Sequence, residues 1–68
     1  MASDITAQTI TVNLWHVFRG ETLLGEVKRS LDGRATFYYA HRAGDPLDTW
    51  FKRDSFEAAA RVLLGIDD

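Results

Sequence analysis

The sequence predicts an α+β domain in which a three-stranded antiparallel sheet packs on one C-terminal helix. Three segments rich in β-forming residues occupy the first two thirds of the 68-residue chain, and turn residues separate them. One segment with helical spacing of its apolar residues follows, at positions 54–65. This order is typical of a two-layer β-β-β-α fold, and we expect residues 1–68 to form a single domain.

The first predicted strand begins at Thr9. Residues 9–14 alternate polar and apolar side chains, which is the period of a strand with one buried face. Residues 14–18 break the alternation, so either both faces are covered there or a bulge between Leu14 and Trp15 exchanges the faces. Residues 1–8 are polar and unpatterned, and we expect them to be frayed.

The second predicted strand covers residues 23–29 and follows a turn at residues 19–22. Gly25 lies inside this strand, where glycine indicates a bulge or the close approach of a bulky neighbour. Trp15 is a plausible neighbour of this kind. We therefore expect an irregularity in the sheet at Gly25.

The third predicted strand covers residues 35–42, which are rich in β-forming side chains. Asp32 and Gly33 precede it and form the strongest short-range hairpin signal in the chain, because this pair tolerates the positive φ angles of tight turns. The sequence therefore predicts a hairpin that joins the second and third strands. Residues 49–53, after a loop containing glycine and proline, fit either a short fourth strand or an extended lead-in to the helix.

The predicted helix covers residues 55–64. Asp54 is the expected N-cap, and Glu57 three residues later can complete a capping box. Gly65 is placed to end the helix in the left-handed conformation. The apolar residues at positions i, i+3, i+4 and i+7 predict the buried stripe, which consists of Phe56, Ala59, Ala60 and Leu63.

Composition narrows the setting in which this chain works. It contains no cysteine, which rules out disulfides and thiolate metal sites and favours a reducing, cytoplasmic location. No basic segment followed by an apolar run begins the sequence, and no apolar stretch approaches the roughly 20 residues of a membrane helix. We therefore expect neither a signal peptide nor contact with a membrane.

No catalytic, cofactor or metal site is predicted. His16 and His41 lie near strand ends without a cysteine or a clustered carboxylate, which is too few ligands for a metal. Ser30 and Ser55 stand where turns and helix caps place serine, and no base or nucleophile motif accompanies them. A chain of this size also lacks walls for a deep pocket, so we expect no small-molecule substrate. These absences favour a binding protein over an enzyme.

The aromatic residues indicate where a partner binds. Strand alternation places Tyr38 on the face opposite Phe37 and Tyr39, and the helix can cover only one face. We predict that Tyr38 stands on the uncovered face near Arg42, and that these two residues, alone or with Trp15, bind a protein partner or a second copy of the chain. The alternative is that the 43–53 loop covers that face.

Basic side chains support a second hypothesis, which is nucleic-acid binding by the hairpin. A three-stranded sheet can present such side chains to phosphates and base edges in DNA. Charged residues also keep an exposed sheet edge soluble, and the net charge of −2 favours a protein partner. The nucleic-acid hypothesis gains if the arginines share one face without acids among them. The candidate contacts are Lys28, Arg29, Arg34 and Arg42.

The segment from Trp15 to Gly65 contains a loose pattern of Trp15-x-Val17, Leu24-Gly25-x-Val27, Asp32-Gly33, an aromatic third strand, Phe56 and Glu57-Ala58-Ala59. This pattern resembles the three-strand-one-helix DNA-binding domains of plant ethylene-response factors and the arm-site-binding domains of tyrosine integrases. It is also similar to small actinobacterial and phage modules of unknown function. The resemblance implies a β-β-β-α fold and DNA contacts from the basic strand residues just named. This chain departs from those families in being acidic.

Overall fold

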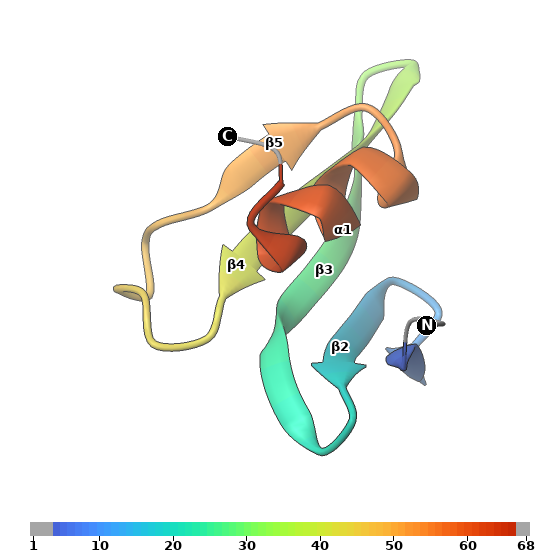
Figure 1. Cartoon of the computed structure of the whole chain (residues 1–68). Coiled ribbons are helices and arrows are strands. Elements are labelled where there is room, and N and C mark those ends of the chain that lie inside the picture. Colours follow the sequence, from blue (N-terminus) through green and yellow to red (C-terminus); the bar gives the residue numbers. More distant parts are fainter. Residues whose placement is uncertain (1–3, 67–68) are drawn as a thin grey trace.

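A computed structural model describes residues 4–66 and shows an antiparallel sheet with one helix on it (Figure 1). The α+β class and the single C-terminal helix are confirmed, but the sheet has five strands in the order β1-β2-β3-β4-β5, not three. The elements are β1 (Ile5–Thr11), β2 (Leu14–Arg19), β3 (Thr22–Asp32), β4 (Ala35–Arg42), β5 (Phe51–Arg53) and α1 (Phe56–Leu64).

The predicted first strand is in fact two strands. The chain reverses at Val12 and Asn13, so β1 and β2 form a hairpin. The Asn13 amide donates a hydrogen bond of 3.1 Å to Thr11 Oγ1, which stabilises this turn locally. The register shift falls between Thr9 and Thr11, not between Leu14 and Trp15. The break in alternation at residue 14 therefore marks the start of a new strand.

Both ends of the sheet extend beyond the prediction. Residues 5–8, which we expected to be frayed, form the first half of β1 and pair with β2 from Ile5↔Arg19 to Gln8↔His16. Residues 1–3 lie outside the described residues. At the other end, Phe51–Arg53 form a short strand that pairs with Tyr38–Ala40 of β4, which decides between the two alternatives for this segment.

Gly25 marks a bulge, as predicted. The β2–β3 register shifts between Val17, which pairs with Gly25, and Phe18, which pairs with Leu23. The close neighbours of Gly25 are the backbone carbonyl of His41 and the side chain of Leu63, not Trp15. The missing side chain therefore lets the end of α1 and strand β4 approach β3.

The β3–β4 hairpin turns one residue later than predicted. Asp32 is the last residue of β3 and pairs with Ala35, so Gly33 and Arg34 are the two central turn residues. Gly33 has φ 65°, and no other residue type has positive φ within residues 4–66. A positive φ at the first central position alone is the pattern of a type II′ turn, which glycine favours there.

Helix α1 begins and ends with side-chain and glycine caps. Ser55, not Asp54, is the N-cap, and its Oγ accepts a 3.1 Å hydrogen bond from the Ala58 amide. Gly65 adopts φ 79° and ends the helix, as predicted. The Oε2 atom of Glu57 lies 3.4 Å from Nη2 of Arg61, one helical turn later. The shift of the cap by one residue starts the helix at Phe56.

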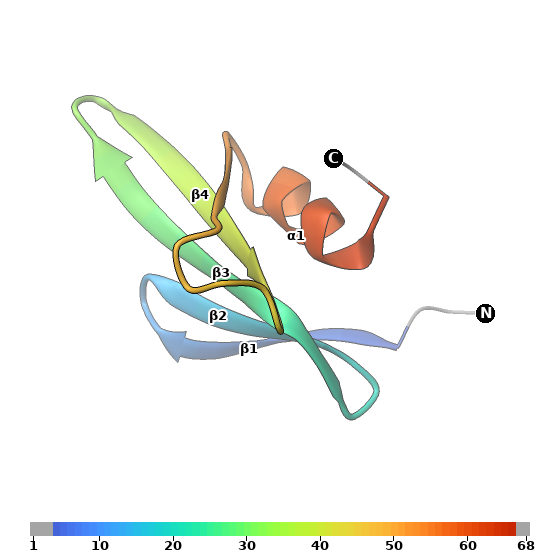
Figure 2. The same cartoon turned by 90° about the vertical axis from the view of Figure 1, so that its left-hand side faces the viewer.

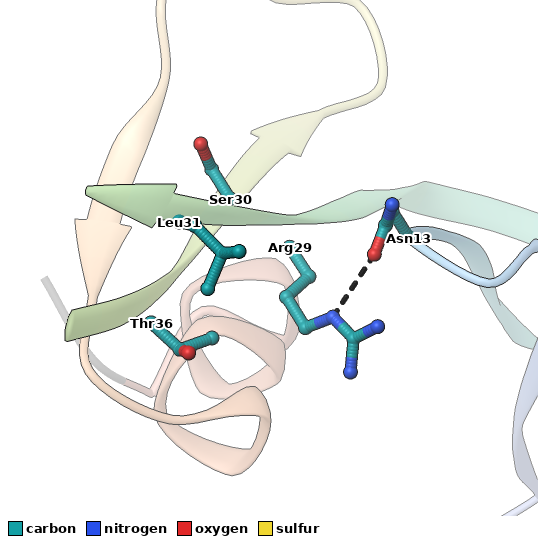
Figure 3. A pocket seen from close by; sticks show the side chains of 5 residues that line it. All are labelled: Asn13, Arg29, Ser30, Leu31 and Thr36. Atoms are coloured by element: carbon teal, nitrogen blue, oxygen red, sulfur yellow. Dashed lines mark hydrogen bonds between the residues drawn. The ribbon is translucent and has the colours of Figure 1, made fainter. Parts of the chain in front are cut away.

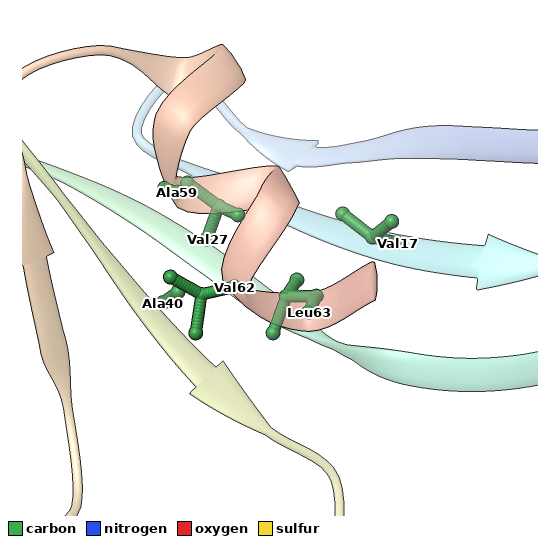
Figure 4. Packing of buried hydrophobic residues seen from close by; sticks show 6 residues of the cluster. All are labelled: Val17, Val27, Ala40, Ala59, Val62 and Leu63. Atoms are coloured by element: carbon green, nitrogen blue, oxygen red, sulfur yellow. The ribbon is translucent and has the colours of Figure 1, made fainter. Parts of the chain in front are cut away.

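The core lies between α1 and one face of the sheet (Figures 2 and 4). Of the predicted stripe, Ala59 and Leu63 are buried and Phe56 and Ala60 are half-buried. Val62, outside the predicted stripe, is also buried, because the helix sits across several strands. The buried cluster consists of Val17, Val27, Ala40, Ala59, Val62 and Leu63.

Candidate functional site: the open face of the sheet

The strand register determines which side chains share a face of the sheet. Directly paired residues of antiparallel strands point to the same side. One row, Trp15↔Val27↔Ala40↔Phe51, joins the core and therefore lies under α1. The alternate residues form the opposite face, on which no helix of the described residues 4–66 lies (Figure 2). We call it the open face; its main residues are Gln8, His16, Glu26, Lys28, Phe37, Tyr39, His41 and Lys52.

A hollow of about 270 Å³ lies on the open face beside Tyr39. It is lined by Lys28, Ser30, Tyr39 and Trp50, and its two aromatic side chains are only partly buried. Trp50 comes from the segment between β4 and β5, and its indole Nε1 donates a 3.0 Å hydrogen bond to the Leu47 carbonyl. That bond fixes the indole as one wall of the hollow.

Lysine and aromatic side chains alternate along the open face. Lys52 Nζ lies 4.0 Å from the centre of the Phe37 ring and 3.5 Å from Asp32 Oδ2. Lys28, by contrast, is exposed and forms no ion pair with a carboxylate within residues 4–66. The hollow therefore combines two rings with one ammonium group that has no anionic partner within residues 4–66.

Glu26 lies between the two histidines on the open face. Its carboxylate oxygens are 3.8 Å from His16 Nε2 and 4.0 Å from His41 Nδ1. His41 is buried, its Nε2 is 2.9 Å from the Pro46 carbonyl oxygen, and its ring centre is 5.0 Å from that of Trp50. Strand pairing therefore brings one carboxylate, Glu26, close to both histidines, although the three residues lie far apart in the sequence.

Trp50 and the 43–50 segment cover one end of the open face near His41. The sequence left open that the 43–53 loop covers the face opposite the helix, and part of this loop does so. It buries His41 but leaves Trp50 itself 37% exposed. Tyr39 and Phe37 stay half-buried. The open face is therefore partly covered at one end and uncovered along β4.

Tyr38 lies on the face under α1, so its predicted place on the uncovered face is wrong. The centre of its ring lies 6.2 Å from that of Phe56, in an edge-on contact, and 6.3 Å from that of Trp15. The ring centres of Trp15 and Phe56 are 5.1 Å apart. These three rings pack against the core at the N-terminal end of the helix. Alternation correctly separated Tyr38 from Phe37 and Tyr39, but the helix covers the side opposite to the one expected.

Arg42 shares the helix side with Tyr38 but lies further along β4. Its Nε donates a 2.9 Å hydrogen bond to Asp45 Oδ2, and its guanidinium carbon is 4.9 Å from the centre of the Phe51 ring. The structure therefore brings Trp15 and Tyr38 together and places Arg42 in a separate contact with an acid.

The candidate nucleic-acid contacts do not share one surface. Lys28 faces the open side, whereas Arg29 and Arg42 face the helix side, and Arg34 lies in the hairpin turn.

Arg29 Nε donates a 3.0 Å hydrogen bond to Asn13 Oδ1 (Figure 3). Figure 3 also shows Ser30 on the opposite side of the strand from Arg29. Acids pair with two nearby bases, since Asp45 binds Arg42 and Asp32 binds Lys52.

Three aromatic residues of this site were not among the predicted site residues: Phe37, Tyr39 and Trp50. A signal for the first two was present in the sequence. Ala40 has the same strand parity as Tyr38, and a small residue at the middle of a strand permits the close approach of a helix. Ala40 and Gly25 lie on the same face of the folded sheet, but the sequence alone does not determine how their strands pair, so this signal favours one face without assigning the helix to it.

Comparisons with known proteins find no family model, curated protein or solved structure that significantly matches this chain. The proposal for the function of this site therefore depends on the geometry of the site alone. Within residues 4–66, no cluster of three or more histidine, cysteine or acidic side chains is placed to hold a metal ion. The one helix of the described chain is too short to cross a membrane.

Proposed function

We propose that this protein is a non-enzymatic interaction module that binds a protein partner through the open face of its sheet. The observation that supports this most is the group of partly exposed rings, Phe37, Tyr39 and Trp50, on a face without a helix. Tryptophan and tyrosine are among the side chains that most often contribute strongly to the affinity of protein interfaces.

The hollow beside Tyr39 suggests what the partner contributes. An apolar or aromatic side chain fits between Tyr39 and Trp50, where its burial removes apolar surface from water. A carboxylate on the same partner segment can pair with Lys28, which has no anionic partner within the described residues. The partner segment therefore combines an apolar anchor with a nearby acid.

Binding of DNA by the basic hairpin, which the resemblance to ethylene-response factors and integrases implies, has weaker support. The four candidate side chains point in different directions, and two bases in this region are paired with acids. The net charge of −2 also weakens the case for DNA binding, because affinity from counterion release requires several unpaired basic side chains on one surface. The five-stranded sheet also differs from the three strands expected from that resemblance.

The test compares capture of proteins from the source cells by the wild-type chain and by Tyr39→Ala and Trp50→Ala. Thr36→Ala is the matched control, because Thr36 is exposed on the same strand as Tyr39 but faces the helix side. We expect a captured protein that is retained by the control and lost with both aromatic variants. Binding of the purified partner should weaken by about 2 kcal/mol or more in each variant.

A second measurement separates a protein partner from nucleic acid. Binding of fluorescently labelled duplex and single-stranded DNA is measured by anisotropy at two salt concentrations. We expect no binding at moderate salt, and only a weak salt dependence for the protein partner. Tight binding to DNA that falls steeply with salt and is lost in Lys28→Ala would contradict the proposal.

A further inference from the structure

Strand β1 is an exposed sheet edge without the usual protection against pairing. It is seven residues long, lies at the end of the strand order, and has no charged residue, proline or glycine. All of its residues after Ile5 are exposed. Natural edge strands are commonly kept short, charged or interrupted to prevent association. An uncharged edge of this length is therefore suited to accept another strand.

The hydrogen bonds of the sheet show which backbone groups of β1 point outward. The Gly20 amide donates a 3.1 Å hydrogen bond to the Asp4 carbonyl. Asp4 and Gly20 are the pair next to Ile5↔Arg19 in the β1–β2 register, so they form a hydrogen-bonded pair of this ladder. In an antiparallel ladder, alternate residues direct their backbone groups to the same side. The backbone amide and carbonyl groups of Thr6 and Gln8 therefore point toward β2. Those of Ala7 and Thr9 point away from the sheet.

The opposite edge of the sheet differs from β1 in length and in charge. Strand β5 has only three residues and includes Lys52 and Arg53. A second copy brought against it would place like charges side by side, which disfavours pairing. Of the two outer strands, only β1 combines length with the absence of charge. This contrast argues for self-association at β1, because an uncharged edge does not repel its own copy.

We propose that two copies of this chain pair β1 with β1 in antiparallel orientation about a two-fold axis at Gln8. In this register, Ala7 of each copy lies opposite Thr9 of the other, and the two pairs exchange four backbone hydrogen bonds. Gln8 is the middle residue of β1 and meets its own copy across the axis. Both Gln8 side chains point to the open face, where the two amides can bond to each other.

The dimer forms one continuous ten-stranded sheet. A two-fold axis perpendicular to the sheet keeps both copies of α1 on one side and both open faces on the other. Dimerisation would thus double the aromatic surface for which partner binding is proposed above, but it does not depend on that function. The residues that test it lie on β1, and those that test partner binding lie on β4 and the 43–50 segment.

The first experiment introduces a charge at position 8, which lies on the proposed two-fold axis. Dimerisation of the full chain is measured by sedimentation equilibrium over a range of concentrations for wild type, Gln8→Lys and Gln8→Glu. Like charges directly opposite should weaken the dimer by about tenfold in each variant alone. An equimolar mixture of the two variants should restore it, because opposite charges then meet. Thr36→Lys, an exposed change on β4, should dimerise like wild type.

The outcomes decide the proposal directly. Circular dichroism should show unchanged folding, because Gln8 is exposed. A wild-type chain that stays monomeric at all concentrations would overturn the proposal and leave β1 for a strand of another protein. A dimer that both charged variants form as well as wild type would place the contact on another surface and overturn it equally.

A second experiment tests the register through a single introduced thiol, since the chain has no cysteine. Opposite residues of a non-hydrogen-bonded pair have Cα atoms about 4.5 Å apart, which a disulfide can span. Gln8→Cys should therefore form an intermolecular disulfide under mild oxidation. Ala7→Cys is the matched control and should form it much more slowly. Faster coupling of Ala7→Cys than of Gln8→Cys would overturn the register.

Discussion

The Cδ2 atom of Leu63 lies 2.7 Å from the point that a β-carbon on Gly25 would occupy. Leu63 is in the last turn of α1 and Gly25 is at the bulge of β3, so the two residues set how closely the helix approaches the sheet. The His41 carbonyl of β4 is nearer still to that point. The helix, β3 and β4 therefore meet where β3 lacks a side chain.

Gly25→Ala should destabilise the fold by about 2–4 kcal/mol, because the new methyl group overlaps backbone as well as side-chain atoms. The measurement is urea unfolding followed by tryptophan fluorescence. Gly44→Ala is the control, because Gly44 also has a positive φ (92°) but a β-carbon there meets no atom within 4 Å, so that only the backbone strain of about 1 kcal/mol remains. A similar small loss in both variants would show that the close packing at Gly25 is not a constraint.

Leu63→Ala should cost about 2–5 kcal/mol of unfolding free energy, since it removes a buried side chain from the centre of a small core. A chain of this size has little stability to lose, so the thermal midpoint should fall steeply. Leu47→Ala removes the same atoms from a side chain that is 88% exposed, and should change stability by less than about 0.5 kcal/mol. Equal effects of the two changes would contradict the helix register.

Ser55→Ala should destabilise the protein by about 1 kcal/mol, because it removes the oxygen that accepts from the Ala58 amide at the start of α1. Asp54→Ala is the matched control at the neighbouring position, and its effect should be clearly smaller. Chemical denaturation of both variants measures the difference. A larger loss for Asp54→Ala would support the cap predicted from sequence over the one in the structure.

Gly33→Ala should cost about 1 kcal/mol, since a β-carbon is strained at φ 65° although the space around it is free. Gly33→Asn should restore little of the loss, because asparagine tolerates the left-handed helical region and not the ψ of the first central position of a type II′ turn. Arg34→Ala, at the other central turn position, should be nearly neutral. Thermal unfolding of the three variants gives the comparison, and full recovery with asparagine would indicate a different turn.

The elements with strong local signals were predictable from sequence. The helix begins and ends within one residue of the prediction, and β4 has the predicted bounds exactly at 35 and 42. The bulge at Gly25 and the left-handed Gly65 follow from the backbone freedom of glycine. Each of these features depends on residues adjacent in the chain, so short-range patterns were sufficient to find it.

The turn at Val12 and Asn13 was missed because it contains no glycine or proline and interrupts a run of β-forming residues. A run of this kind suits one long strand as well as two short ones. Pairing with β3 and with β1 favours the hairpin, and that pairing exists only in the folded sheet. Strand number was therefore a property of the whole sheet and could not be decided locally.

Strand alternation alone determined that Tyr38 and Tyr39 point to opposite faces, and only the tertiary structure decided which of them α1 covers. The period of a strand assigns side chains to two faces but does not label either face as the core. That label comes from the pairing of Ala40 with Val27 and from the space at Gly25, into which Leu63 packs. Contacts between residues far apart in the chain thus placed Tyr38 in the core and left Tyr39 on the open face.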